Sequence, residues 1–198
     1  MNNIYDYIPS GSHKVVERYI KEEDLNILIK KKRLSKYGDF RKIDAKNYLI
    51  TVNDNLNPHQ FLITLVHEIA HYKTFKIYGT KKKPHGVEWK QMFKKLMQPL
   101  LNDTVYPLAI LDPLKDYMQN PSATSDRHFS LSRALKNTEE NSDKNYIFDL
   151  DIGVAFRFCQ RNFTLIQKKR TRAVCTENSS QKKYLINLNS EVSILKNE

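Results

Sequence analysis

Several residue types are scarce in this chain, and each scarcity excludes a class of protein. Only 2 cysteines occur among 198 residues, too few for a disulfide-rich secreted scaffold or for a zinc ribbon of four thiolates. With 5 glycines and 7 prolines, collagen-like and linker-like compositions are excluded. No apolar run approaches the ~20 residues of a membrane span, and the first residues lack the pattern of a signal peptide. We therefore expect a globular, cytoplasmic protein without a membrane segment.

Acidic residues are also in deficit. The chain has 22 Asp+Glu against 33 Lys+Arg, which gives a net charge of +11. Such an excess favours polyanionic partners such as DNA, RNA or acidic membrane surfaces. Many small cytosolic proteins carry lysines only for solubility, so charge alone leaves both interpretations open.

The pattern of apolar residues divides the chain into three parts. Residues 1–118 alternate helical and strand patterns, which is typical of an α+β domain. Residues 119–145 are polar and are expected to form a linker, with a short helix around 128–136. Residues 146–198 consist of short strand patterns rich in basic residues. The sequence therefore predicts a first domain, a linker and a small β-rich C-terminal module.

The first third of the chain contains one expected helix and two expected strands. Apolar residues at helical spacing predict a short helix around 15–20. Strand patterns follow at 26–32 and 46–53, and Gly38-Asp39 between them indicates a turn. We expect the two strands to pair as a hairpin.

Two helices are expected in the middle of the chain. Asn57 is a good N-cap and Pro58 is suited to the first helical position, so a helix should begin there. Gly79 is a natural residue for its C-terminal end. A second amphipathic helix is expected over residues 89–97, with an apolar stripe that we assign to core packing.

The first of these helices carries the motif His-Glu-Ile-Ala-His at residues 67–71. Two histidines at i and i+4 lie on one face of a helix, so His67 and His71 can bind the same metal ion. Glu68 is rotated by about 100° from His67, outside that coordination sphere but within reach of a water molecule beside the metal. This arrangement is what a zinc hydrolase requires, with Glu68 as general base and later as general acid.

A catalytic zinc ion usually has a third protein ligand. His85 is the preferred candidate, because it follows the turn at Gly79 and precedes the next helix, with Gly86 allowing a close approach of the backbone. Glu88 remains a competing ligand, since sites with two histidines and one glutamate also exist. The other histidines lie at less suitable positions: His13, His59 and His128.

These motifs resemble the SprT-like family of zinc metalloproteases, to which the eukaryotic protease Spartan belongs. The resemblance covers most of residues 1–118 and rests on the segments LSKYGDFR, ITVNDNLNP, FLITLVHEIAH and PHGVEWKQMF. The family pattern is HExxH followed by a third zinc-binding histidine in an HG-x-x-W/F context. The C-terminal part resembles the extension of SprT-like proteins from Bacteroidetes-type bacteria.

The resemblance implies a set of functional properties. It assigns zinc binding to His67, His71 and His85 and catalysis to Glu68. It implies a gluzincin-like core in which a small β-sheet packs beside the zinc-binding helices, and an association with DNA. Many family members end in a zinc ribbon, but this chain has only Cys159 and Cys175, so we expect a degenerate, zinc-ribbon-like module without a second zinc ion.

The C-terminal module contains dense basic runs. Residues 157–183 include eight basic residues and one acidic residue, Glu177, and aromatic residues are interleaved with them. Cations on one face of a strand can neutralise phosphates, and exposed aromatic rings can stack on single-stranded bases. The alternative is a solvated sheet edge whose lysines prevent aggregation. The expected nucleic-acid contacts are Lys168, Lys169, Arg170, Arg172, Lys182 and Lys183.

Together these features predict a zinc-dependent metalloendopeptidase that cleaves DNA-associated or DNA-crosslinked proteins. We expect one Zn²⁺ ion, protein substrates, DNA (single-stranded DNA included) as a partner, a monomer, and a cytoplasmic or nucleoid-associated location. The alternative is a nucleic-acid-binding protein with a structural zinc ion and little or no protease activity. A small-substrate zinc hydrolase is a weaker alternative, because it gives the basic module no role. No spacing argument selects a transition-state-stabilising hydroxyl among Tyr72, Tyr78 and Tyr106.

Overall fold

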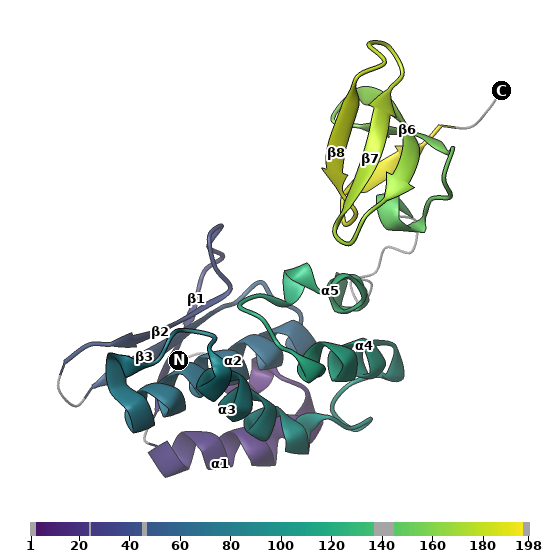
Figure 1. Ribbon diagram of the computed structural model, residues 1–198. Helices are drawn as coiled ribbons and strands as arrows, with labels where there is room; N and C mark the ends of the chain where they lie inside the picture. Colours follow the sequence, from purple (N-terminus) through teal and green to yellow (C-terminus); the bar gives the residue numbers. More distant parts are fainter. Residues whose placement is uncertain (1–2, 24, 45–46, 137–144, 196–198) are drawn as a thin grey trace. The chain divides into compact units, whose positions relative to one another are not determined.

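The computed structural model describes residues 3–23, 25–44, 47–136 and 145–195 (Figure 1). Contacts between Cα atoms divide the chain into two compact units, Met1–Ser125 and Asp126–Glu198. The described residues form five α-helices and two β-sheets, so the fold is α+β as predicted. Residues 137–144 of the expected linker lie outside the described residues, and the boundaries 1–118, 119–145 and 146–198 stay a prediction. Among the described helices, none combines the length and the apolar character needed to span a bilayer.

A three-stranded sheet forms one layer of the first unit. Its strands are β1 (Asn26–Lys30), β2 (Gly38–Lys42) and β3 (Tyr48–Asn53), in the order β1-β3-β2. The predicted hairpin of the first and last of these strands is wrong, because β1 and β3 pair in parallel. The hairpin instead joins β3 to β2, which pair antiparallel. The sequence GDFRK of β2 contains weak strand formers, so only the pairing with β3 makes it a strand.

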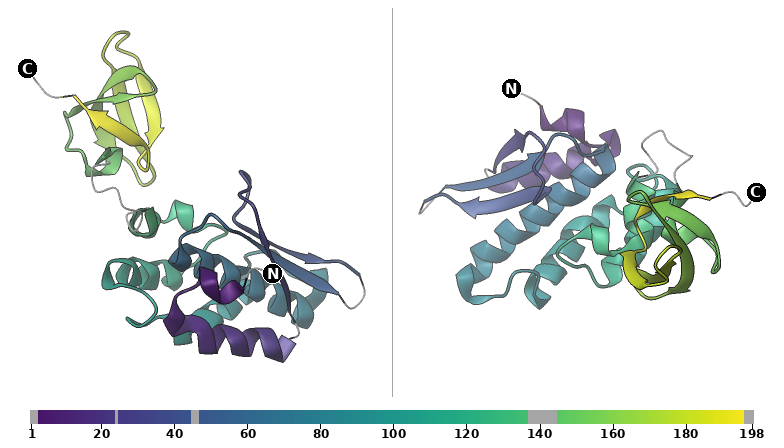
Figure 2. Two further views of the ribbon diagram at one scale, coloured as in Figure 1. Left: turned by 180° about the vertical axis from the view of Figure 1, so that it is seen from behind. Right: turned by 90° about the horizontal axis from the view of Figure 1, so that it is seen from above.

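The helix α2 (Pro58–Tyr78) is the central element of this unit. The Asn57 side chain accepts a hydrogen bond from the Gln60 N–H at 2.9 Å, so Asn57 is the predicted N-cap. Gly79 ends the helix with a φ of +60°, a left-handed conformation in which glycine meets no steric penalty. Most side chains of α2 are buried, because the sheet packs along the helix on one side and α3 (Val87–Met97) packs on another (Figure 2).

Two further helices, α1 (His13–Glu23) and α4 (Leu108–Gln119), belong to this unit beside α2 and α3. In α1, Val16 and Tyr19 are buried, and the Tyr19 hydroxyl donates to the Leu96 carbonyl at 2.8 Å. The predicted apolar stripe of α3 is largely buried, as expected for core packing. The helix α4 has Pro113 in its interior and still buries an apolar face at helical spacing.

The second unit is built mainly from an antiparallel sheet. The short helix expected around 128–136 is present as α5 (Phe129–Lys136). The sheet has the order β4-β9-β5-β6-β7-β8, and its apolar core is continuous. Its strands are β4 (Asn145–Tyr146), β5 (Ala155–Phe158), β6 (Arg161–Lys168), β7 (Arg172–Glu177), β8 (Lys183–Asn187) and β9 (Glu191–Ile194).

The two cysteines of the second unit lie in different environments. Cys175 is buried in the core of the sheet, and burial raises the pKa of its thiol to about 11. Cys159 is exposed in the turn between β5 and β6. Neither forms a disulfide.

Candidate metal centre

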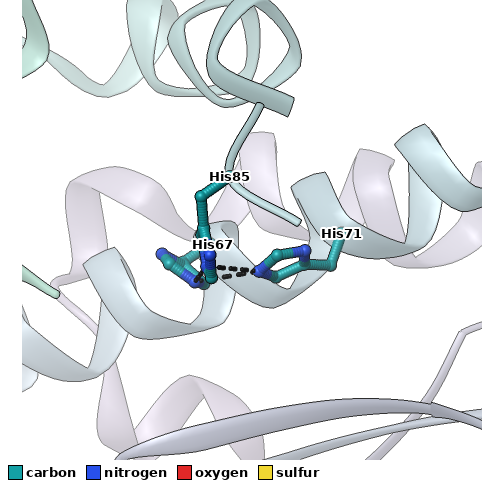
Figure 3. A group of neighbouring side chains, drawn as sticks. All are labelled: His67, His71 and His85. Atoms are coloured by element: carbon teal, nitrogen blue, oxygen red, sulfur yellow. Dashed lines mark hydrogen bonds between the residues drawn. The ribbon is translucent and has the colours of Figure 1, made fainter. Parts of the chain in front are cut away.

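Three histidine side chains converge at one point in the first unit. His67 and His71 lie one turn apart on α2, because residues at i and i+4 share a face of a helix. His85 comes from the segment between η3 (Gly79–Lys81) and α3. Figure 3 shows the three imidazole rings pointing toward one another. The structure thus brings together the three histidines that the sequence singled out as metal ligands.

The Nε2 atoms of the three rings form a close triangle. Nε2 of His71 lies 3.1 Å from Nε2 of His67 and 2.9 Å from Nε2 of His85, and the remaining separation is 3.1 Å. A ring nitrogen of a neutral imidazole either donates or accepts a hydrogen bond. Three converging nitrogens therefore cannot satisfy one another, since at least one pair meets lone pair to lone pair or hydrogen to hydrogen. A shared cation removes this conflict.

The geometry and the chemistry of this triangle fit a metal ion. An ion held tetrahedrally by imidazole nitrogens at 2.0–2.1 Å separates them by roughly 3.3 Å, slightly more than the observed distances. A neutral, all-nitrogen donor set suits divalent transition metals such as zinc rather than calcium or magnesium. The three histidines can therefore hold a metal ion.

An apolar platform supports the three rings. The indole of Trp89 lies 4.6 Å from the ring centroid of His67, 5.2 Å from that of His71 and 4.7 Å from that of His85. Phe93 stacks on Trp89 at 5.0 Å and contacts His67 at 5.6 Å. Trp89 is 1% exposed and Phe93 is fully buried. One α-helical turn of α3 thus fixes the orientation of the imidazoles and excludes water from one side of the cluster.

The burial of the cluster keeps the histidines neutral. Burial, followed by the charges of His71 and His85, lowers the pKa of His67 to about 2. Burial and then His85 lower the pKa of His71 to about 3, and burial lowers that of His85. Since a metal ion binds the neutral imidazole, the site holds its ligands in the required form at neutral pH.

The loop that carries His85 is tightly folded. His85 has a φ of +59°, a left-handed conformation that costs a non-glycine residue on the order of 1 kcal/mol. The Gly86 N–H donates to the Lys83 carbonyl at 2.9 Å, and a Cβ on Gly86 would lie 2.9 Å from the same oxygen. An ion pair of 2.7 Å between Lys82 and Glu88 spans this turn. Glu88, the competing ligand in the sequence, is therefore paired with a lysine and lies outside the histidine cluster.

Glu68 lies beside the cluster, under the edge strand β2. Its side chain is 7% exposed, and it accepts a hydrogen bond from the Phe40 backbone N–H. Gly38 leaves the space for it. A Cβ on Gly38 would lie 2.8 Å from Oε1 and 2.9 Å from Cγ of Glu68, and 2.7 Å from Cγ2 of Thr64. Any side chain at position 38 would therefore displace the carboxylate, the strand or both.

The surroundings of Glu68 favour its protonated form while no cation is bound. Burial is the largest cause and the charge of Asp39 the next, and together they raise the pKa of Glu68 to about 8. The charges of Arg33 and Lys36 and the Phe40 N–H oppose this shift. A bound metal ion would add positive charge and lower the pKa again, because opposite charges favour the ionised form.

Polar groups on the sheet extend this network. Lys36 and Arg41 pair with Asp39 at 3.1 Å and 2.6 Å. Arg33 donates through Nε to Asn53 Oδ1 at 2.7 Å and through Nη1 to the Thr51 hydroxyl at 3.0 Å. Its Nη2 atom is buried and has no partner among the described residues. The charges near Glu68 are therefore held in fixed positions rather than on free surface chains.

The other histidines and the candidate tyrosines lie outside the cluster. His13 is 3.4 Å from the Ile8 carbonyl, His59 packs against Tyr106 at a ring distance of 5.6 Å, and His128 belongs to the second unit. Tyr106 is fully buried, and its hydroxyl has no partner among the described residues. Tyr72 packs edge-on against Phe40 and Tyr48. None of these contacts selects a transition-state-stabilising hydroxyl.

The predicted nucleic-acid contacts fall into two groups at opposite ends of β7. Residues 168–172 form the turn between β6 and β7, where the Lys169 N–H donates to the Arg172 carbonyl at 2.7 Å. Lys182 and Lys183 lie at the turn between β7 and β8. Lys168 also donates to the Phe148 carbonyl at 2.6 Å. The six residues of β7 separate the groups by roughly 17 Å.

Two contributions to the site were not predicted from the sequence. The apolar stripe of α3 predicts only core packing for Trp89, whereas the structure places its indole against all three histidine rings. Gly38 was assigned to a turn, whereas it lies in the edge strand against Glu68. Its effect depends on how closely strand and helix approach, which no local sequence signal reports.

Comparison with known proteins adds one match. Residues 12–107 match the family model of the SprT-like family. Searches of curated proteins and of solved structures found no match. The matched segment contains all three histidines of the cluster, Glu68, Gly38 and Trp89.

Proposed function

Since the chain belongs to the SprT-like family through residues 12–107, we propose that it is a zinc-dependent metalloendopeptidase. The observation that carries the proposal is the triangle of Nε2 atoms with the buried Glu68 next to it. A three-stranded sheet beside the helices that carry these residues is consistent with a gluzincin-like core. A metal site and a protonatable carboxylate at one place are the two requirements of metal-assisted amide hydrolysis.

His67, His71 and His85 would hold the ion. When bound, zinc would supply a Lewis acid that lowers the pKa of a water molecule and polarises a carbonyl group. The neutral state of the buried imidazoles favours its binding, and the Trp89 platform holds their geometry.

Glu68 would move the proton. As a carboxylate it accepts a proton from the attacking water molecule, whose oxygen forms the new bond to the peptide carbonyl carbon. As a carboxylic acid it then gives that proton to the leaving nitrogen while the C–N bond breaks. Burial keeps the carboxyl group away from bulk water, and the Phe40 N–H and the space above Gly38 hold it in one position.

The second unit would bring the peptidase to DNA. Arg172 and Lys183 lie on the face of the sheet that points away from its core, because Ala173 and Cys175 point inward and Lys183 pairs with Thr176. Basic groups this far apart suit contacts to different phosphates of a nucleic acid rather than to a single anion. We propose DNA-associated or DNA-crosslinked proteins as substrates, single-stranded DNA included among the partners, and action as a monomer at the nucleoid.

A second candidate function rests on the same basic surface. In it the protein binds nucleic acid, the zinc ion is structural, and peptidase activity is small or absent. The position of Glu68 favours the peptidase, since a structural site gains nothing from a buried carboxyl group beside the metal.

The proposal is tested by measuring cleavage of a DNA-binding protein by the zinc-loaded full chain. The reaction is run with and without single-stranded DNA, and with the metal removed by a chelator. We expect cleavage that requires zinc and increases with DNA. Zinc-dependent cleavage without any effect of DNA would retain the peptidase and remove the role of the basic surface. Salt-sensitive DNA binding without cleavage would favour the second candidate function.

A further inference from the structure

A groove of about 710 Å³ lies on the first unit, between α1, the last part of α2 and the last part of α3. One row of side chains from each helix lines it, at spacings of three and four residues. None of the three histidines and no part of Glu68 belongs to the lining. The groove is therefore a feature separate from the metal centre.

The charge of this groove is unbalanced. Four basic side chains line it, and Glu22 is its one carboxylate; the basic residues are Arg18, Lys73, Lys76 and Lys95. Glu22 lies 4.0 Å from Arg18 and 3.9 Å from Lys73, both at the outer limit of an ion pair. Arg18, Lys76 and Lys95 are exposed. The side chains that line the groove therefore carry more positive than negative charge, which favours an acidic ligand.

The groove also has an apolar lining. Ile77 is 61% exposed on the last turn of α2, and Met92 is partly exposed on α3. Leu96 lies beneath them and is 5% exposed. Ile77 is a large aliphatic side chain in solvent among lysines. A ligand that covers it removes apolar surface from water and so lowers the free energy of the complex.

The same lining argues against nucleic acid as the occupant. Its one aromatic residue, Tyr19, is 5% exposed, and its hydroxyl is held by the Leu96 carbonyl. The groove therefore offers no exposed aromatic ring on which a base could stack, and its aliphatic lining would not contribute to binding a phosphate backbone. An acidic peptide with aliphatic side chains can both pair with the basic residues and bury the aliphatic lining.

We propose that this groove binds an acidic, aliphatic peptide segment of a partner protein, in helical form. Leucine-type side chains spaced three and four residues apart would cover Ile77 and Met92. Carboxylates on either side of that stripe would pair with Lys76, Lys95 and Arg18. The proposal goes beyond the proposed peptidase function, since it requires neither zinc nor Glu68, and it gives the first unit a means of recruiting partners.

The test is a fluorescence-anisotropy titration of the full chain with a labelled peptide of sixteen residues. Its leucines repeat at i, i+3, i+4 and i+7, and glutamates flank them. Two matched probes accompany it: the same peptide with serine in place of leucine, and a single-stranded oligonucleotide. We expect the leucine peptide to bind at least about tenfold more tightly than the serine peptide.

Groove variants and matched surface variants decide where the peptide binds. The double variant Lys76→Glu/Lys95→Glu should weaken binding of the leucine peptide about tenfold, and Ile77→Ser should weaken it several-fold. The control pair Lys14→Glu and Lys115→Glu, also exposed, should leave it unchanged.

The second control, Leu108→Ser, removes an equally exposed aliphatic side chain, at 66%, from α4. A thermal unfolding midpoint for every variant confirms that it is folded. Absence of peptide binding, equal binding of the serine peptide, or equal weakening by the controls would overturn the proposal. So would a groove variant that weakens only oligonucleotide binding.

Discussion

Two glutamates, one in each unit, are equally buried and have opposite chemistry. Glu68 and Glu177 are both 7% exposed. Burial and Asp39 raise the pKa of Glu68 to about 8. Hydrogen bonds from Arg161 and Ser180 outweigh burial and lower the pKa of Glu177 to about 2. At the same small exposed fraction, the Arg161 guanidinium and the Ser180 hydroxyl hold Glu177 as an ion, whereas burial is the largest influence on Glu68 and leaves it able to exchange a proton.

The partners also explain what each glutamate does for its unit. The Arg161 guanidinium lies 4.5 Å from the centroid of the Tyr184 ring and 5.2 Å from that of Phe163, so the pair with Glu177 is part of the packing. Glu68 has a backbone N–H as its hydrogen-bond donor, and the cations near it are held by other groups. Glu177 is therefore a structural ion, whereas Glu68 is suited to proton transfer.

The largest effect is expected from removing a metal ligand. Replacing His71 by alanine leaves two imidazoles, so zinc affinity should fall by at least about a hundredfold and peptidase activity should be lost. Isothermal titration with zinc measures the affinity. His59→Ala is the matched control, since His59 lies on the same helix outside the cluster, and its affinity should equal that of the wild type. Unchanged zinc binding by His71→Ala would contradict the proposed site.

The next effect concerns the space that Gly38 leaves for Glu68. Gly38→Ala should lower kcat by about ten- to a hundredfold with zinc content unchanged, because the new Cβ displaces the carboxylate. Thr64→Ser removes the Cγ2 atom on the other side of the clash. The double variant Gly38→Ala/Thr64→Ser should therefore recover the unfolding stability that Gly38→Ala alone loses, but it should not recover kcat. Full recovery of kcat in the double variant would show that Gly38 serves packing alone.

A smaller effect is expected from the pH dependence of the metal-free first unit. The pKa values of His67 and His71 lie far below their ordinary value in the folded state, so the unfolded chain binds more protons. The folded state should therefore lose stability as the pH falls below about 6.5. Glu68, with its raised pKa, shifts stability in the opposite direction above about pH 4.5. In Glu68→Gln the unfolding midpoint should be flat above pH 6.5 and fall below it.

Trp89 makes this measurement selective. It is the one tryptophan of the chain, and it contacts all three histidine rings. Its fluorescence therefore reports unfolding of the first unit alone, in the presence of a chelator. If the unfolding midpoint of Glu68→Gln does not change between pH 7 and pH 5, this would contradict the burial of neutral histidines.

The smallest effect is expected from Glu177→Gln. The variant should lower the unfolding midpoint of the second unit by a few degrees and leave peptidase activity unchanged. In the wild type, the contribution of the Glu177 ion is fully present above about pH 5 and is lost as the pH falls toward 2, because its folded pKa is depressed. Hydrogen exchange of the amides in β6 and β7 measures this. A variant with unchanged exchange would contradict the structural role.

Local periodicity was sufficient to predict α1, α2, α3, α5 and the histidine pair, whereas α4 was not predicted. The caps at Asn57 and Gly79 and the i, i+4 spacing of the motif depend only on residues near one another in the chain. The strand β2 depends on its antiparallel partner β3, and the parallel pairing of β1 with β3 joins residues more than twenty positions apart, such as Asn26 and Leu49. The space at Gly38 depends on the approach of strand to helix, which the sequence does not encode in any short pattern.

The basic C-terminal residues show the same limit. Their dense run in the sequence predicted one binding surface, but the antiparallel pairing places Lys168–Arg172 and Lys182–Lys183 at opposite ends of β7. Charge could be predicted from composition, whereas its distribution over the surface required the register of the strands.

The two glutamates offer the most direct test of the proposed chemistry. Zinc-loaded Glu68→Gln and Glu177→Gln are compared with the wild type for cleavage of one protein substrate, with the zinc content of each measured. The account predicts equal zinc content in all three, a loss of about a hundredfold or more in kcat for Glu68→Gln, and wild-type kcat for Glu177→Gln. Full activity of zinc-loaded Glu68→Gln would contradict the account.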